Sequence, residues 1–214
     1  EYMYNKITET INAFSDEDLK KLVGTIFTEN KEKLLKWPAA YKLHHAIRGG
    51  LLMHTLSIVK LCEGVCEVYP FVDKDLLLSG AILHDIAKTL EFNVGETGLA
   101  NGYSVEGNLI GHLVMGAMMV REAADKLGTD KKREMLLEHM ILSHHGEPEF
   151  GAAVRPLFLE AELLSELDLM DARVYQIHEA ITPLKEDDFS GRLWALDNRK
   201  IYNHGLADNK KDVD

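Results

Sequence analysis

The chain has 214 residues, of which 46% are hydrophobic and 28% are charged, a composition typical of a globular protein with one compact domain. Its formal net charge of −11 disfavours a broad nucleic-acid groove on this chain alone, because phosphate backbones are bound mainly by Lys and Arg. No apolar stretch is long enough to span a bilayer and no signal segment is recognisable, so we expect a cytoplasmic protein.

Apolar residues recur at helical rather than strand spacing throughout, and no run alternates long enough to suggest a sheet, which predicts an all-α helical bundle with the site in its interior. Ser15, which precedes three acidic residues, is predicted to cap the second helix, and Gly128 is predicted to end the fifth. The glycine-rich stretch 92–107 is predicted to be a long loop. The predicted helices cover roughly residues 3–13, 16–36, 51–68, 74–87, 107–127, 130–144 and 156–179.

Several of these helices carry a metal-capable side chain on the face that should point inward. His54 stands three residues after Leu51 and four before Ile58, so it lies on the apolar stripe of its helix. The pair His84-Asp85 emerges from a small-residue, apolar face at the end of the fourth helix. Both members of this pair are predicted to reach one metal ion.

The later helices continue the pattern. His112 lies inside the apolar run 109–120, and His144 and His145 follow an apolar helix end. Asp168 and Asp171 occupy positions on the apolar seam of the last long helix, where spacings of three and four residues alternate. The site thus draws on five helices.

Buried carboxylates and imidazoles need partners, and metal coordination satisfies both kinds of group at once. The mixture of imidazole nitrogen and carboxylate oxygen favours one or two divalent ions of Mn, Fe, Co, Ni or Zn. A single histidine on an apolar face is more often a hydrogen-bonded core residue, and for His112 taken alone that interpretation is preferred. The same structural role is assigned to His44, His45, His139, His178 and His204.

The remaining sulfur-containing residues are interpreted as core. Cys62 and Cys66 share one face of a helix, which suits two buried apolar side chains better than a disulfide. Met115, Met118 and Met119 are assigned to the core in the same way.

The ordered set His54, His84-Asp85 and Asp168 resembles the HD superfamily of metal-dependent phosphohydrolases. Several longer segments look like the HD domain of YhaM-type 3′-to-5′ exoribonucleases, and so does Glu160-Ala161, which leads into Asp168. The segments that carry this resemblance are 44–56, 83–88, 107–112, 142–146 and 168–172. The resemblance covers about residues 37–202. We expect an HD domain at 37–182, N-terminal helices at 1–36 packing on its core, and a C-terminal arm and tail at 183–214, where the helical pattern weakens.

The resemblance also implies roles for individual residues. A first metal ion would be bound by His54, His84, Asp85 and Asp168. Asp85 would bridge to a second ion, whose other ligands would be His112, His144 and His145. Lys88 would neutralise a phosphate oxygen, so that the catalytic residues would be His84, Asp85 and Lys88, while Asp171 would orient a ligand.

These roles predict hydrolysis of a phosphomonoester or phosphodiester by a metal-activated water, with a nucleotide or short single-stranded oligonucleotide as substrate. Residues 1–40 do not resemble the OB-fold that this family carries, so an upstream nucleic-acid-binding domain or a partner would supply further nucleic-acid affinity. Two alternatives remain open. One is an HD-fold di-iron oxygenase, and the other is a non-catalytic module that senses a nucleotide.

Overall fold

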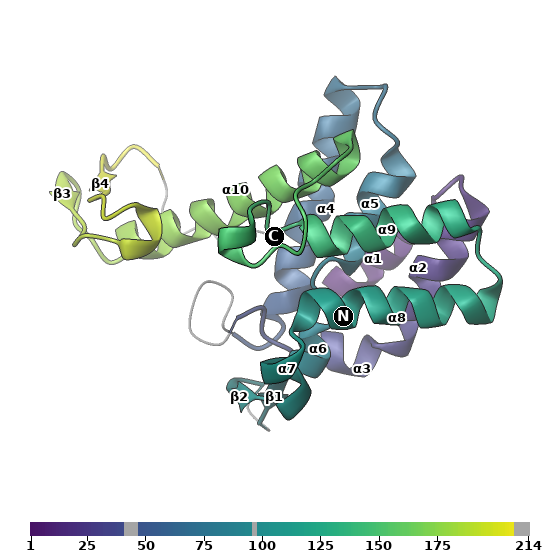
Figure 1. Cartoon of the computed structure of the whole chain (residues 1–214). Coiled ribbons are helices and arrows are strands. Elements are labelled where there is room, and N and C mark those ends of the chain that lie inside the picture. The colour runs from purple at the N-terminus through teal and green to yellow at the C-terminus, as the bar shows by residue number, and fades with distance from the viewer. Residues whose placement is uncertain (41–46, 96–97, 208–214) are drawn as a thin grey trace. The chain divides into compact units, whose positions relative to one another are not determined.

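The computed structural model describes residues 1–40, 47–95 and 98–207. This part of the chain forms two compact units, Glu1–Asp168 and Leu169–Asp214, and the boundary falls inside helix α10. Most of the secondary-structure elements are helices, as Figure 1 shows. The helices are α1 (Tyr2–Asn12), α2 (Glu17–Glu29), α3 (Lys31–Leu34), α4 (Gly50–Val68), α5 (Lys74–Leu83), α6 (Lys88–Glu91), α7 (Val105–Leu109), α8 (His112–Leu127), α9 (Lys131–Ser143) and α10 (Leu159–Ile181), with 3-10 turns η1 (Pro148–Phe150) and η2 (Trp194–Leu196).

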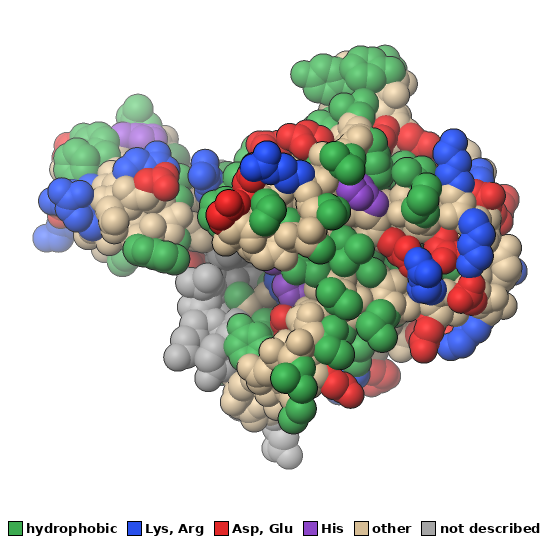
Figure 2. Space-filling view, in the orientation of Figure 1, with side chains coloured by type: hydrophobic (Ala, Val, Ile, Leu, Met, Phe, Trp, Pro, Cys, Tyr) green, Lys and Arg blue, Asp and Glu red, His purple; other side chains and the backbone are tan. Residues whose placement is uncertain are grey.

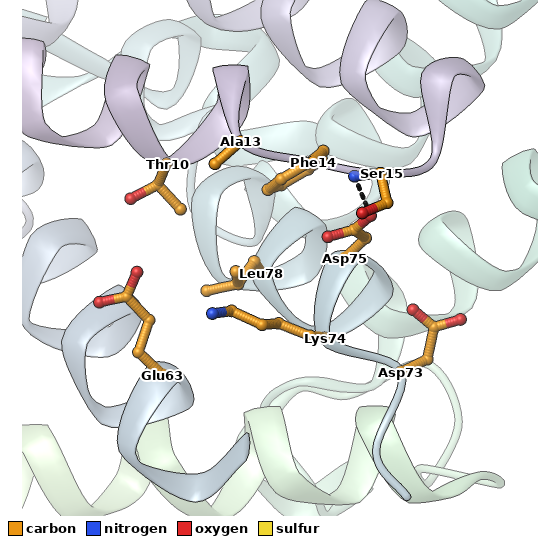
Figure 3. Close-up of a pocket in the computed structure, with 9 residues that line it drawn as sticks. All are labelled: Thr10, Ala13, Phe14, Ser15, Glu63, Asp73, Lys74, Asp75 and Leu78. Carbon is orange, nitrogen blue, oxygen red and sulfur yellow. Dashed lines mark hydrogen bonds between the residues drawn. The ribbon is translucent and has the colours of Figure 1, made fainter. Parts of the chain in front are cut away.

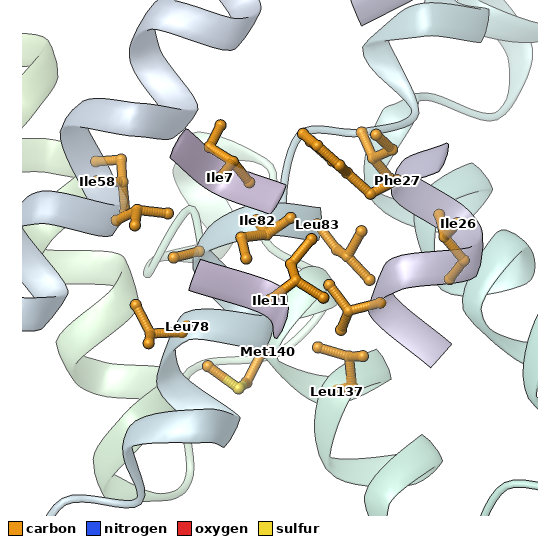
Figure 4. Packing of buried hydrophobic residues seen from close by; sticks show 14 of the residues in the cluster. Ile7, Ile11, Ile26, Phe27, Ile58, Leu78, Ile82, Leu83, Leu137 and Met140 are labelled. Carbon is orange, nitrogen blue, oxygen red and sulfur yellow. The ribbon is translucent and has the colours of Figure 1, made fainter. Parts of the chain in front are cut away.

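The first unit is a helical bundle around one apolar core, which confirms the predicted all-α class. Helix α8 packs along α9, α4 packs along α5, and α2 contacts both α5 and α8. Side chains such as Ile11 of α1, Ile58 of α4 and Leu137 of α9 meet in this core (Figure 4). The N-terminal helices therefore share the core of the helices that follow. None of the described helices is long and apolar enough to cross a membrane.

Two predicted helices end earlier than the sequence pattern suggested, and a third begins later. Helix α2 stops at Glu29, where the Asn30 side chain donates to the carbonyl of Ile26 at 2.9 Å. Helix α5 stops at Leu83, which leaves His84 and Asp85 just outside it. Helix α8 starts only at His112, because Gly111 has a φ of +78° and separates it from α7.

The prediction of a loop at 92–107 was wrong in part, because this stretch contains an antiparallel pair of strands. Strands β1 (Phe92–Val94) and β2 (Ala100–Tyr103) pair antiparallel, and the rings of Phe92 and Tyr103 lie 5.1 Å apart. A second short pair, β3 (Asp188–Phe189) and β4 (Tyr202–Asn203), lies in the second unit. Strands this short carry too little alternation to be recognised from sequence.

The cap of α2 lies one residue later than predicted. Asp16, not Ser15, accepts the backbone N–H groups of Asp18 and Leu19. The backbone N–H groups of Ser15 and Asp16 instead donate to Asp75 in the first turn of α5, at 2.7 and 2.8 Å. Figure 3 shows the Ser15 bond at the edge of a pocket of about 400 Å³ that contains no predicted site residue. Asp75 thereby fixes the α1–α2 turn against α5.

Among the residues predicted to lie in the core, the prediction for Met118 was wrong. Cys62 and Met115 are buried as predicted, whereas Met118 is 56% exposed. Val105, Leu109 and Val114 of α7 and α8 are exposed as well, and Figure 2 shows apolar side chains gathered on the face where these helices lie. The predicted structural histidines His44 and His45 lie outside the described residues.

Gly107 is the glycine whose replacement should be most informative. A Cβ there would lie 2.3 Å from the backbone carbonyl oxygen of Glu91, so Gly107→Ala must push α7 away from α6. We expect the free energy of unfolding to fall by about 1–3 kcal/mol in urea denaturation, as for other overpacked sites. Gly64→Ala is the control, because Gly64 is exposed on α4 and a Cβ added there would meet no atom within 4 Å outside its own helix backbone. That change should be neutral or stabilising by up to about 1 kcal/mol, and equal losses in the two variants would contradict the steric argument.

Candidate metal centre

The first unit brings seven of the predicted site residues together in its interior. They come from the second turn of α4, the residues directly after α5 and α9, the first residue of α8, and α10. Three overlapping sets of these side chains have ligand atoms within 4.8 Å of one another. The seven residues are His54, His84, Asp85, His112, His144, His145 and Asp168.

The first group gathers around the facing imidazoles of His54 and His84. Their Nε2 atoms lie 3.1 Å apart, and Oδ1 of Asp168 lies 3.1 Å from Nε2 of His54 and 3.9 Å from that of His84. Oδ2 of Asp85 lies 3.7 and 3.5 Å from the same two nitrogens. Four ligand atoms thus converge on one small volume.

The second group faces the other oxygen of Asp85. Oδ1 of this carboxylate lies 3.3 Å from Nε2 of His112 and 3.6 Å from Nε2 of His144. His145 completes the group with its ring 4.4 Å from that of His144 and 5.3 Å from that of His112. Asp85 therefore lies between the two groups and presents one oxygen to each.

Backbone carbonyls fix which nitrogen of each imidazole faces the cluster. Nδ1 of His84 lies 2.9 Å from the carbonyl of Ala81, and Nδ1 of His144 lies 2.7 Å from that of Ile141. Since a carbonyl can only accept, Nδ1 carries the proton and Nε2 presents its lone pair to the cluster. Both histidines directly follow a helix, where carbonyls three residues back have lost their helical partners. The helix ends therefore determine the tautomer of their own histidines.

Three buried atoms of the cluster lack a hydrogen bond: Oδ1 of Asp85 and Nε2 of His112 and His144. Leaving such atoms unsatisfied costs on the order of 1–3 kcal/mol each. Each of them is an atom that can coordinate a metal, and they converge on one side of the site. These residues therefore fit a divalent cation, as the mixture of His and Asp in the sequence predicted.

The charges of the site also suit metal binding. Burial would raise the pKa of Asp85, but the Lys88 ammonium and His84 hold that pKa well below its usual range. Burial would also raise the pKa of Asp168, but His54 and His84 lower that pKa below its usual value. Burial lowers the pKa of His145 to about 4. Ionised carboxylates and neutral imidazoles are the forms that bind metal ions.

Lys88 and Asp171 have different relations to this cluster. Nζ of Lys88 lies 2.7 Å from Oδ2 of Asp85, on the side of the first group. Asp171 follows Asp168 by one turn of α10 but belongs to the second unit, and its role in orienting a ligand stays a prediction. His139 accepts the backbone N–H of Leu157, which agrees with the structural role assigned to it.

Sequence reasoning missed Glu91, whose buried carboxylate contacts His112. Its Oε1 lies 3.0 Å from Nδ1 of His112 and 3.2 Å from the backbone nitrogen of the same residue. The available signal was an acid three residues after Lys88, beside the His84-Asp85 motif. Glu91 stands next to a glycine-rich stretch rather than on a periodic apolar face, so apolar periodicity does not indicate it.

Comparison with known proteins agrees with this arrangement. The family model described as the HD domain matches residues 51–173, more than half of the chain. The chain belongs to the HD-domain family. The match begins within α4, just before His54, and ends within α10, shortly after Asp168, so it includes all seven clustered residues.

Curated relatives extend the similarity beyond this domain. The chain is 36% identical over 203 residues to proteins named 3′-5′ exoribonuclease YhaM from Listeria welshimeri and Listeria monocytogenes. The alignment covers 95% of this chain but 64% of each relative, so the chain spans less than two thirds of their length. No solved structure matches the chain significantly. The resemblance to the HD domain of YhaM-type proteins is thereby confirmed.

A divalent cation should stabilise the folded chain strongly, because it would satisfy the unpaired buried atoms around Asp85. In thermal denaturation after chelator treatment, Mn²⁺ at about 100 times its dissociation constant should add about 2.7 kcal/mol to the free energy of unfolding. Asp85→Ala should lose this stabilisation and the bound metal while keeping its helical circular dichroism. Asp125→Asn, a change in an exposed ion pair with Lys131, is the control and should respond like the wild type. A normal metal response of Asp85→Ala would contradict the site.

The metal-free chain should lose stability as the pH falls from about 6.5 to about 4. In this range the unfolded chain protonates His145 while the folded chain, with its lowered pKa, does not. The unfolded state then binds more protons, so stability is complete above pH 6.5 and declines as the pH falls through the window. Urea midpoints measured in chelator at pH 7 and pH 5 should differ less in His145→Gln than in the wild type. An identical pH dependence in the two proteins would contradict this assignment.

Proposed function

We propose that the chain is an HD-type metal-dependent phosphohydrolase that cleaves a phosphate ester of a nucleotide or short single-stranded oligonucleotide. The observation that carries the proposal is the carboxylate of Asp85, which presents one oxygen to each of two groups of metal-capable side chains. Membership of the HD family and similarity to proteins named 3′-5′ exoribonuclease support it. Removal of nucleotides from a 3′ end is the activity that the name of these relatives states, and we propose it as the finer activity of this chain.

Within this proposal the side chains would hold two divalent ions. The first would be bound by His54, His84, Asp85 and Asp168, and the second by Asp85, His112, His144 and His145. When bound, the ions would supply Lewis acidity that makes a water nucleophilic at neutral pH and offsets charge on the phosphoryl group. The ligand set suits Mn, Fe, Co, Ni or Zn.

Lys88 would contribute a fixed positive charge beside the reacting phosphate. Burial would lower its pKa, but Asp85 raises the pKa above the usual lysine value, so the ammonium stays charged. Its side chain is 17% exposed and lies next to the carboxylate shared by both groups. From this position it can donate to a phosphate oxygen, whose negative charge grows during the reaction.

The negative charge of the chain supports a separate source of nucleic-acid affinity. At −11 the chain repels a phosphate backbone at long range, so binding energy for a longer RNA would come from elsewhere. The relatives are longer than this chain, which supports a further domain or a partner in that role. In this assignment residues 37–182 form the catalytic HD domain, 1–36 pack on its core and 183–214 form a C-terminal arm and tail.

The test combines elemental analysis with an Mn²⁺-supplemented assay on two substrates, bis-p-nitrophenyl phosphate and a short 5′-labelled RNA. We expect about two ions per chain, hydrolysis of the small diester, and stepwise shortening of the RNA from its 3′ end. Hydrolysis of only the small diester would place the chain with nucleotide phosphohydrolases. Two irons with oxygen consumption and no hydrolysis, or nucleotide binding without turnover under every metal, would overturn the proposal.

Lys88→Gln separates phosphate stabilisation from metal binding in the same assay. We expect unchanged metal content and a kcat lowered on the order of 100-fold, since one donor to the developing charge is lost. Lys126→Gln, which removes an exposed ammonium from the last turn of α8, is the control and should behave like the wild type. A normal kcat in Lys88→Gln would remove Lys88 from the mechanism.

A further inference from the structure

The buried carboxylate of Glu91 lies behind His112, on the side of the imidazole away from the cluster. Glu91 is the last residue of α6 and is 7% exposed. Its Oε1 contacts Nδ1 of His112 at 3.0 Å, while Nε2 of that ring lies 3.3 Å from Asp85. Glu91 thus contacts one side of the His112 ring, and Asp85 lies at the other side, within the second group of candidate ligands.

The two contacts of Oε1 define the tautomer of His112. The backbone N–H of His112 donates to Oε1, so this oxygen acts as an acceptor. The ring atom Nδ1, which contacts the same oxygen, must then carry a proton and donate as well. Nε2 is left with its lone pair, and it is one of the buried atoms that lack a hydrogen bond. Glu91 therefore prepares His112 to coordinate through Nε2.

His112 differs in this respect from its neighbours in the second group. Nδ1 of His144 faces the carbonyl of Ile141, and Nδ1 of His145 faces that of Phe150 at 2.9 Å. A carboxylate behind an imidazole makes the opposite nitrogen a stronger metal ligand than a neutral carbonyl does. His112 is accordingly the strongest imidazole donor of its group.

The surrounding backbone holds Glu91 in place. Its carbonyl accepts the backbone N–H of Ser104 at 2.8 Å, and the Ser104 hydroxyl donates to the carbonyl of Leu90. Gly107 approaches Glu91 so closely that a Cβ could not fit. His112 itself begins α8, so its N–H has no partner within the helix and Glu91 supplies one. The carboxylate is thus fixed by α6, the turn before α7 and the start of α8.

We propose that Glu91 is a positioning residue that sets the affinity of the second metal ion through His112. The inference rests on the proposed function, because it takes His112, His144 and His145 as ligands of that ion. The hydrogen bonds and ion pair of the Glu91 carboxylate in the described residues go to His112, although its charge also helps to raise the pKa of Lys88, so its effect should fall mainly on the second ion.

The test is a Mn²⁺ titration of chelator-treated protein, followed by calorimetry and by the paramagnetic resonance signal of free Mn²⁺. Glu91→Gln keeps the shape and one acceptor oxygen but removes the charge. It should bind the first ion like the wild type and the second ion 10- to 100-fold more weakly, in the range seen when such outer partners are changed. Glu106→Gln removes an exposed acid from the neighbouring helix α7 and serves as the matched control, with two normal affinities expected.

The possible outcomes separate this inference from the proposed function. A wild type that binds no ion would overturn the proposed function itself. Two ions in the wild type with an unchanged second affinity in Glu91→Gln, or an equal loss at both ions, would overturn the role of Glu91 alone. Histidine ¹⁵N spectra of the metal-free wild type give a second readout that needs no folded Glu91 variant, with His112 assigned by its loss in His112→Gln. A proton on Nε2 instead of Nδ1 of His112 would also contradict the inference.

Discussion

The site depends on one buried charge, the carboxylate of Asp85. It is 3% exposed and lies at the end of α5, in the middle of the first unit. An isolated carboxylate in such a place would be protonated or would destabilise the fold, because burial penalises the ionised form. Here Lys88 lies 2.7 Å from one oxygen, and imidazoles approach both. The helices that supply these groups must therefore pack so that they meet at Asp85, and this requirement links the fold to the chemistry.

Helix ends satisfy much of this requirement with local backbone geometry. His84 and His144 each follow the last residue of a helix and hydrogen-bond a carbonyl three residues back. His112 begins α8, where a free N–H is available to Glu91. Histidines inside a helix could not use these backbone groups, since the helix already pairs them. Placing His84 and His144 directly after helix ends thus fixes both the direction of each ring and its tautomer through backbone carbonyls alone.

The sequence was sufficient to predict the all-α class and the residues that cluster, because each stood on a periodic apolar face or directly beyond one. It was insufficient where local geometry decides. The apolar pattern predicted a helix that continues past Leu83, but α5 ends there. Apolar periodicity does not show that the His84 side chain bonds the carbonyl of Ala81. The β1–β2 hairpin has strands of three and four residues, too short for a period of two to be seen. Met118 matched its apolar neighbours in composition but faces outward on α8.

Glu91 was missed for a related reason, and in the proposed dinuclear site it would offset the unequal composition of the two groups. In the proposed assignment both groups share Asp85, but the first adds the carboxylate of Asp168, whereas the second adds imidazoles alone. A second group of that kind would offer a divalent ion less negative charge than the first. The carboxylate of Glu91 lies one imidazole further away, and through the Nδ1–H of His112 it passes part of its charge toward Nε2. In the proposed site the second group would thus gain negative charge from a residue that is not itself a ligand, although that acid has no place on an apolar stripe.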